Sequence, residues 1–232
     1  MSQDAPDWIR RLRGRFLVFD GPDGGGKTTL VRRFAQCVKQ AGLSVCEVRE
    51  PGGTAIGEQI RQILLDPSFE AMDLSCEMLL YMASRAQLVA EQIRPALGRG
   101  ELVLADRFVS STLAYQGAAG GIDVSQIRRI GQIALGNCWP DLVVILDVDE
   151  KTTASRLLGG SKRTRRVESM QSLFADRMEL KGREFQDRVR QGYLAQVKDD
   201  PLRHLLIDAT ADIETVYQRL LDVVAKAVSS RF

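Results

Sequence analysis

Short apolar segments alternate with amphipathic stretches along the chain. Five mostly apolar segments predict strands, at residues 16–19, 45–48, 102–105, 142–146 and 205–207. Between them, apolar residues recur every three or four positions, as at Leu30, Phe34 and Val38, and this spacing predicts helices. A long helix is expected from Ser75 to Leu97, bent near Pro95. The alternation favours an α/β fold with a five-stranded parallel sheet and helices on both faces.

The 232 residues suffice for one domain with a sizeable core, and no linker or internal repeat divides them. We therefore expect a single domain over residues 1–232. Residues 1–14 are predicted to be a solvated, partly frayed extension, with a docking helix around Trp8 and Ile9 as the alternative. The segment from about 159 to 190 is rich in Arg and Lys and interrupts the alternation, which predicts an insertion over the active face.

Composition excludes several classes of protein. Lys and Arg number 32 and Asp and Glu 30, a balance that argues against nucleic-acid binding. No apolar run approaches the roughly 20 residues of a membrane-spanning helix, so no membrane association is expected. The cysteines lack metal-ligand spacing, and Cys37, Cys46 and Cys76 are predicted to be buried. This cysteine usage fits a reducing, cytoplasmic location.

A glycine-rich motif follows the first predicted strand and precedes a predicted helix. Residues 21–28 match the pattern G-x-x-x-x-G-K-[ST], in the context that this motif requires. Its glycines let backbone N–H groups surround phosphate oxygens, and they are Gly21, Gly24, Gly25 and Gly26. Lys27 is expected to reach the β- and γ-phosphates of ATP, and the Thr28 hydroxyl to ligate Mg²⁺. The motif alone does not distinguish a kinase from a GTPase or an ATPase motor.

Three further motifs lie where α/β sheets bind ligands. They are Arg49–Thr54, Tyr81–Arg85 and Asp106–Gly117. With the phosphate loop, in this order, the sequence resembles the thymidylate kinase family, which carries G-x-[DE]-G-x-G-K-[ST]-T, R-E-P-G-G-T and D-R-[YFH]…S-x-x-A-Y-Q-G motifs. The resemblance runs from about Phe16 to the final helix. It implies a P-loop kinase fold, a homodimer, and phosphorylation of dTMP to dTDP with MgATP in dTTP biosynthesis.

Two arginines are natural ligands for an acceptor monophosphate, because a guanidinium pairs with phosphate through two parallel hydrogen bonds. They are Arg107 and Arg49, the latter in the turn that contains Pro51. The resemblance further implies that Asp23 contacts the deoxyribose 3′-hydroxyl. It also implies that Tyr115 crowds the sugar 2′ carbon, which would favour deoxyribose.

The resemblance places the base pocket between the long helix and the segment after the third strand. Tyr81 matches a position that is usually Phe and stacks on thymine. Arg85, one turn later, is expected to donate to a thymine carbonyl, with a surface arginine as the alternative. Thr112 and Gln116 are expected to read the other base edge, unless they are ordinary loop residues. Glu50 either braces the neighbouring glycine turn or contacts the substrate.

Asp106 closes an apolar strand, the usual position of an acidic residue at a Mg²⁺ site. Its expected catalytic role is either to hold the ion through water or to orient the acceptor. The resemblance implies that Thr29 completes the nucleotide-binding loop and that Arg156 packs on adenine. The variable loop positions contain no arginine, so positive charge for phosphoryl transfer is expected from the basic segment acting as a lid. Its candidates are Lys162, Arg163, Arg165, Arg166 and Arg177. Arg177, in a D-R-x-E sequence, is the strongest individual candidate.

Two other functions remain open at the level of sequence. A deoxynucleoside kinase acting on thymidine would use Glu50 as the base for a neutral hydroxyl acceptor, but it would not need both Arg49 and Arg107. A nucleotide-switched regulatory or assembly protein would hydrolyse slowly without an acceptor. The base-pocket residues have no use in that second alternative.

Overall fold

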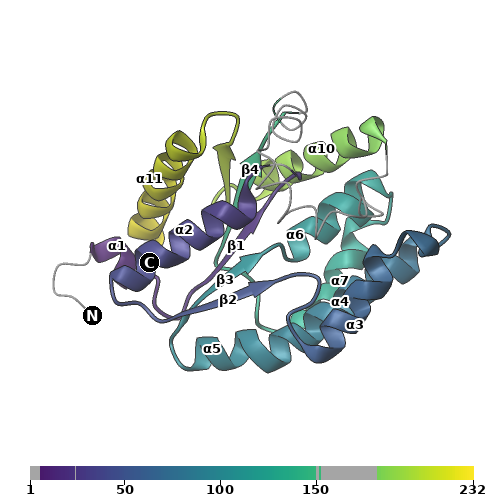
Figure 1. The fold of residues 1–232 in the computed structure, drawn as a ribbon, viewed down its shortest axis with the longest axis horizontal. Helices are drawn as coiled ribbons and strands as arrows, with labels where there is room; N and C mark the ends of the chain where they lie inside the picture. The colour runs from purple at the N-terminus through teal and green to yellow at the C-terminus, as the bar shows by residue number, and fades with distance from the viewer. Residues whose placement is uncertain (1–5, 24, 150–151, 153–181) are drawn as a thin grey trace, which may run out of the picture.

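The computed structural model describes residues 6–23, 25–149, 152 and 182–232. Five parallel strands form one sheet in the order β2-β3-β1-β4-β5 (Figure 1). The strands are β1 (Phe16–Asp20), β2 (Val45–Arg49), β3 (Leu102–Asp106), β4 (Leu142–Asp147) and β5 (His204–Asp208). All five predicted strands and the predicted α/β class are confirmed.

Helices cover both faces of the sheet (Figure 1). The α-helices are α1 (Asp7–Arg10), α2 (Lys27–Gln40), α3 (Ala55–Leu65), α4 (Leu74–Leu88), α5 (Arg94–Gly98), α6 (Val109–Thr112), α7 (Val124–Leu135), α10 (Arg183–Asp199) and α11 (Ile213–Arg231). A 3₁₀ turn, η1 (Pro67–Phe69), and two π-helical turns, η2 (Val89–Ile93) and η3 (Leu113–Ala119), complete the described elements.

The central strand β1 is buried along its whole length and divides its side chains between two cores. Phe16 and Val18 face the core formed with α4, α7 and α10, whereas Leu17 and Phe19 face the core formed with α2 and α11. This division follows from the alternation of side chains along a strand. The chain reaches β3 on one side of β1 and β4 on the other, so ligands are expected at the carboxyl end of β1.

The expected long helix is present as α4, η2 and α5 in succession. Its interruption is a widened π turn that immediately precedes Arg94 and Pro95. Proline has no N–H to donate, and its ring would clash with the carbonyl four residues earlier in a regular α-helix. The π turn relieves this conflict, so the irregularity lies one turn before the proline.

The prediction of a frayed amino terminus is wrong for the described residues 6–14. Helix α1 packs near α11, and Ile9 and Leu12 are buried in the core that contains α2 and α11. The guanidinium of Arg15 lies 3.8 Å from the ring centre of Phe232, which brings the residue before β1 next to the last residue of the chain. The prediction of buried cysteines is also wrong, because Cys76 is exposed and Cys37 and Cys46 are only partly buried.

Helix α10 begins within the segment predicted as a lid. Residues 159–181 lie outside the described part, but residues 183–190 form the first half of α10, where Val189 is fully buried. Arg190 makes a two-contact ion pair with Asp147 at the end of β4, at 2.6 and 2.8 Å. This half of α10 therefore belongs to the packed domain. Among the described helices, none is both long and apolar enough to cross a membrane.

Candidate active site

The phosphate loop connects the end of β1 to the start of α2. Gly21 has a φ of 131°, and a Cβ atom there would lie 2.4 Å from the carbonyl oxygen of Leu146, so only glycine fits. Gly26, with a φ of 77°, precedes the first turn of α2. The Lys27 ammonium donates to the carbonyls of Gly21 and Pro22, at 3.0 and 2.7 Å. Lys27 therefore lies across the loop; Gly24 is outside the described residues.

Thr28 and Asp106 meet at the start of α2 and the end of β3. The Thr28 hydroxyl donates to an Asp106 carboxylate oxygen at 2.7 Å. Hydroxyl and carboxylate oxygens are the hard ligands that Mg²⁺ prefers. The two residues that sequence analysis predicted as Mg²⁺ ligands are thus brought together, and their donor chemistry fits that ion. Thr29, the next residue of α2, is exposed.

A fully buried carboxylate, Asp20, lies beneath the loop at the carboxyl end of β1. Sequence analysis missed it, although an acid that ends an apolar strand before a glycine loop was a usable signal. Its nearest donors are the Gly21 N–H at 2.9 Å and the hydroxyls of Ser110, Ser111 and Tyr193 at 2.6, 2.7 and 2.6 Å. Asp20 thus joins the phosphate loop, the segment after β3 and helix α10.

Arg107 connects this buried carboxylate to the loop. Its φ of 69° lies in the left-handed region that non-glycine residues rarely occupy. One end of the guanidinium contacts Asp20 at 3.3 Å, and the other forms a short ion pair with Asp23. The Tyr115 hydroxyl donates to the other Asp23 oxygen at 3.0 Å. Asp23 of the phosphate loop and Arg107 and Tyr115 of the segment after β3 therefore form one cluster.

The charged groups in this cluster shift one another's pKa values. Partial burial acts to raise the pKa of Asp23, but Arg107 and Lys27 outweigh it and hold that pKa well below its usual range. Burial and the neighbouring Arg107 lower the pKa of Lys27, against the attraction of Asp23. Asp23 is therefore a carboxylate held between two cations. This arrangement accounts for an acidic residue inside a phosphate-binding loop.

Arg85 is almost fully buried, so the alternative of a surface arginine is wrong. Its Nε and Nη2 atoms donate to the Glu50 carboxylate, with an ion-pair distance of 2.6 Å, and Nη1 donates to the Thr112 hydroxyl at 3.1 Å. Burial raises the pKa of Glu50, and the Arg85 charge opposes that rise. Glu50 therefore orients Arg85 in this structure, which neither of its two predicted roles described.

A second buried contact joins helix α4 to the segment after β3. The Gln116 amide nitrogen donates to the Glu77 carboxylate at 2.7 Å, and both residues are buried. Thr112 and Gln116 are consequently interior residues, and the alternative of ordinary loop residues is wrong. Tyr81 lies on α4 one turn after Glu77 and one turn before Arg85, and is partly buried. The four residues predicted for the base pocket thus share one region.

The turn after β2 is braced by Glu58 of α3. The Glu58 carboxylate accepts from the Gly53 N–H at 2.6 Å and from Arg49 at 2.8 Å. Arg49 also donates to the Pro51 carbonyl at 3.1 Å. The Thr54 hydroxyl accepts from the Gly57 N–H at 2.9 Å and caps α3. The bracing role considered for Glu50 therefore belongs to Glu58, a residue that sequence analysis missed.

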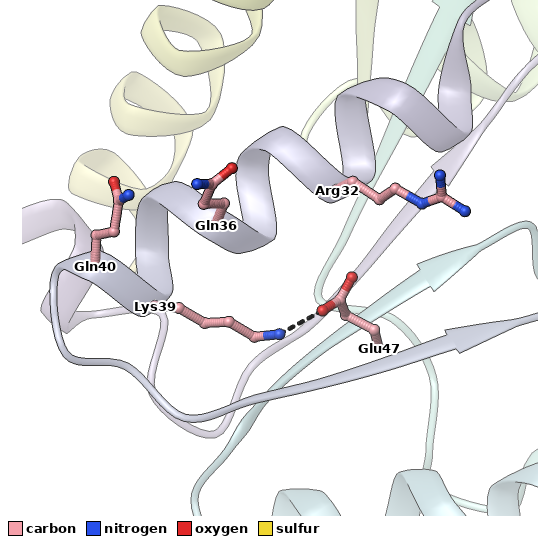
Figure 2. A pocket seen from close by; sticks show the side chains of 5 residues that line it. All are labelled: Arg32, Gln36, Lys39, Gln40 and Glu47. Atoms are coloured by element: carbon pink, nitrogen blue, oxygen red, sulfur yellow. Dashed lines mark hydrogen bonds and ion pairs between the residues drawn. The ribbon is translucent and has the colours of Figure 1, made fainter. Parts of the chain in front are cut away.

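Arg156, predicted to pack on adenine, lies outside the described part of the chain, and so do the predicted residues of the basic segment. The latter are Lys162, Arg163, Arg165, Arg166 and Arg177. A surface hollow of about 520 Å³ opens elsewhere, between α2 and the edge strand β2 (Figure 2). Within it, Lys39 donates to Glu47 at 2.5 Å. Its lining contains none of the predicted site residues, so we do not assign it to the active site.

Known proteins resemble this chain over most of its length. A family model described as thymidylate kinase matches residues 19–220. Thymidylate kinases from Caldanaerobacter subterraneus subsp. tengcongensis and Pseudomonas fluorescens are 39% and 41% identical to it, over 92% and 90% of this chain and 96% and 94% of theirs. A crystal structure of thymidylate kinase from Ehrlichia chaffeensis superimposes with a TM-score of 0.69 at 30% identity, covering 91% of this chain and 98% of that one. The chain therefore belongs to the thymidylate kinase family, a family of nucleoside monophosphate kinases.

Proposed function

We propose that this protein transfers the γ-phosphoryl group of ATP to dTMP, giving ADP and dTDP, as a step in dTTP synthesis. One observation carries the assignment furthest. Asp23 of the phosphate loop is bonded both to Arg107 and to Tyr115, which lie on the segment that also supplies Thr112 and Gln116. The nucleotide loop and the base-pocket segment are therefore in direct contact. This arrangement suits transfer between a nucleoside triphosphate and a second nucleotide.

The acceptor phosphate would lie between Arg49 and Arg107. A phosphate monoester is already an anion near neutral pH, so its oxygen can attack the γ-phosphorus without a strong general base. Arg107 and Lys27 would stabilise charge on the transferring group, and the two arginines would align the acceptor oxygen. Lys27 would exchange its present carbonyl partners in the loop for phosphate oxygens.

The nucleotide would be bound by the backbone of the phosphate loop, with Gly21, Gly24, Gly25 and Gly26 around the phosphates. Thr28 and Asp106 would bind Mg²⁺, which neutralises negative charge on the phosphates when it is present. Thr29 would add a polar contact at the start of α2. Arg156 would pack on adenine and Arg177 would reach the transferring group; both roles remain predictions from the sequence.

The deoxynucleoside would lie against α4 and η3. Tyr81 would stack on thymine, and Arg85, Thr112 and Gln116 would contact the base edges. The ion pair with Glu50 supports the role of Arg85, because it fixes the orientation of the guanidinium beside Thr112. Asp23 would contact the 3′-hydroxyl, Tyr115 would face the 2′ carbon, and Pro51 would border the acceptor site.

The contacts of Glu50 weigh against the alternative acceptor, thymidine. A general base needs a lone pair directed at the acceptor hydroxyl. Both carboxylate oxygens of Glu50 accept hydrogen bonds from Arg85, inside the core. Arg49 and Arg107, at the carboxyl ends of the neighbouring strands β2 and β3, likewise favour an acceptor that already carries phosphate.

We also propose a cytoplasmic homodimer, as the family resemblance implied. Exposed apolar side chains on α3 and α4 support a dimer interface on these two helices. They are Ile56, Ile63 and Leu79, which are 53%, 40% and 51% exposed. Light scattering should give the mass of two 25.8 kDa chains. The mass of one chain would contradict the dimer.

The reaction is tested by measuring ADP production from MgATP with dTMP, thymidine, dUMP, dCMP or no acceptor. Strong turnover with dTMP and little with thymidine is expected. Turnover with thymidine but not dTMP would reject the monophosphate acceptor. Hydrolysis that is insensitive to every acceptor would reject the kinase assignment and favour a nucleotide-switched protein.

A further inference from the structure

Tyr193 of α10 brings its hydroxyl to the carboxyl end of β1. The residue is 1% exposed, and its ring packs in the core beside the ring of Tyr115, with 6.4 Å between ring centres. The hydroxyl donates to Asp20 at 2.6 Å, accepts from Arg107 Nη1 at 3.2 Å, and lies 3.0 Å from the Ser111 hydroxyl. One hydroxyl, supplied by the carboxyl-terminal part of the chain, thus touches three residues around the phosphate loop.

The direction of these bonds follows from the number of hydrogens available. A tyrosine hydroxyl has one hydrogen, and the guanidinium can only donate. The single hydrogen lies on the short contact to the Asp20 carboxylate, so the oxygen lone pairs are left to accept from Arg107. Burial, followed by the nearby Asp20 charge, raises the pKa of Tyr193 well above its usual value, which keeps the hydroxyl protonated for this arrangement.

Arg107 has unusual need of such support. Its backbone is in the left-handed region, and its guanidinium has to lie between a buried carboxylate and the phosphate loop. We propose that Tyr193 is a positioning residue for the acceptor phosphate, because its hydroxyl fixes the orientation of the Arg107 guanidinium. The inference rests on the proposed function, in which Arg107 binds that phosphate.

The variant Tyr193→Phe removes this hydroxyl and keeps the packed ring. Asp20 retains its bonds from Gly21, Ser110 and Ser111, so a folded protein is expected. Tyr217→Phe is the matched control, since its hydroxyl donates to the Arg33 carbonyl at 3.3 Å in the opposite core. Each variant is assayed for kcat, for KM with dTMP and for KM with ATP, well below its melting temperature.

We expect Tyr193→Phe to lower kcat/KM for dTMP about tenfold, the usual size of one lost hydrogen bond to a charged group. Its KM for ATP should stay within twofold of wild type, and Tyr217→Phe should match wild type in both. Unchanged dTMP kinetics, or a Tyr193→Phe protein that does not fold, would make Tyr193 merely structural. Wild-type protein without dTMP turnover would instead reject the proposed function.

A double-mutant cycle with Arg107→Lys tests whether Tyr193 affects the dTMP kinetics through Arg107 or independently of it. If Tyr193 acts by orienting the guanidinium, Tyr193→Phe should change the dTMP kinetics less than twofold once that guanidinium is absent. Tenfold losses that multiply in the double variant would show independent effects and overturn the inference.

Discussion

Asp20 illustrates how a single buried side chain organises this site. A carboxylate without solvent must be compensated by hydrogen bonds or charges. Asp20 receives them from the phosphate loop, from the segment after β3, and from Tyr193, which is 173 residues away in sequence. Its replacement therefore affects three separate segments at once.

We expect Asp20→Asn to lower the free energy of unfolding by about 3 kcal/mol, because an amide nitrogen would face several buried donors. Asp141→Asn is the matched control. Asp141 accepts from the Phe16 N–H at 2.8 Å but is partly exposed, and its replacement should cost about 1 kcal/mol. Urea denaturation measures both variants, and equal losses would contradict the special position of Asp20.

At the scale of elements, the amino-terminal helix α1 is a structural part of the domain. It contains four residues, too few to be stable alone in water. Its formation depends on Ile9 and Leu12, which pack into the core shared by α2 and α11. The arginines between these apolar residues favour the prediction of a solvated tail. The helix forms because of tertiary contacts, which the local sequence does not show.

Leu12→Ala should consequently destabilise the protein by roughly 2–5 kcal/mol, the usual cost of truncating a buried leucine. Ile133→Ala serves as the control, because Ile133 on α7 is 86% exposed and should change stability by less than about 0.5 kcal/mol. Thermal unfolding of the two variants gives the comparison. A Leu12→Ala protein as stable as wild type would instead support the prediction of a frayed extension.

The sequence predicted elements and motifs far better than the contacts between them. The strands and the phosphate loop depend on local patterns, such as the apolar run before Gly21, and all five strands are confirmed. The pairing of Glu50 with Arg85, 35 residues apart, and of Asp20 with Tyr193 depends on tertiary packing, which no local spacing encodes. The contact of Glu58 with the glycine turn could not be predicted from the sequence either, because it also depends on tertiary packing.

At the scale of the whole molecule, the single histidine of the chain makes a defined contribution to the pH dependence of the unfolding free energy. His204 begins the edge strand β5, with Nδ1 at 3.2 Å from the Asp200 carbonyl. Burial lowers its pKa below the usual 6.5, more than the nearby Asp200 carbonyl raises it. The folded state therefore binds the proton less readily than the unfolded state.

Because the folded pKa is depressed, the contribution of His204 to stability is complete above pH 6.5 and is lost as the pH falls through the folded pKa. We expect His204 to lower the unfolding free energy on acidification by at most about 1.4 kcal/mol per pH unit, while Glu50, whose pKa burial raises to about 7, acts in the opposite direction. Relative to wild type, His204→Asn should therefore lose less stability as the pH falls below 6.5. Parallel curves would exclude this contribution.

The pairing of Arg49 with Glu58 and of Arg107 with Asp23 has a consequence for how an acceptor would arrive. An incoming phosphate would exchange places with the carboxylate that is paired with each of these two arginines. The binding free energy gained in such an exchange is only the difference between the new ion pair and the one that it replaces. The acceptor would therefore bind with moderate affinity and dissociate readily. The two carboxylates would compete with every anion for the arginines, so inorganic phosphate would also bind weakly at this site.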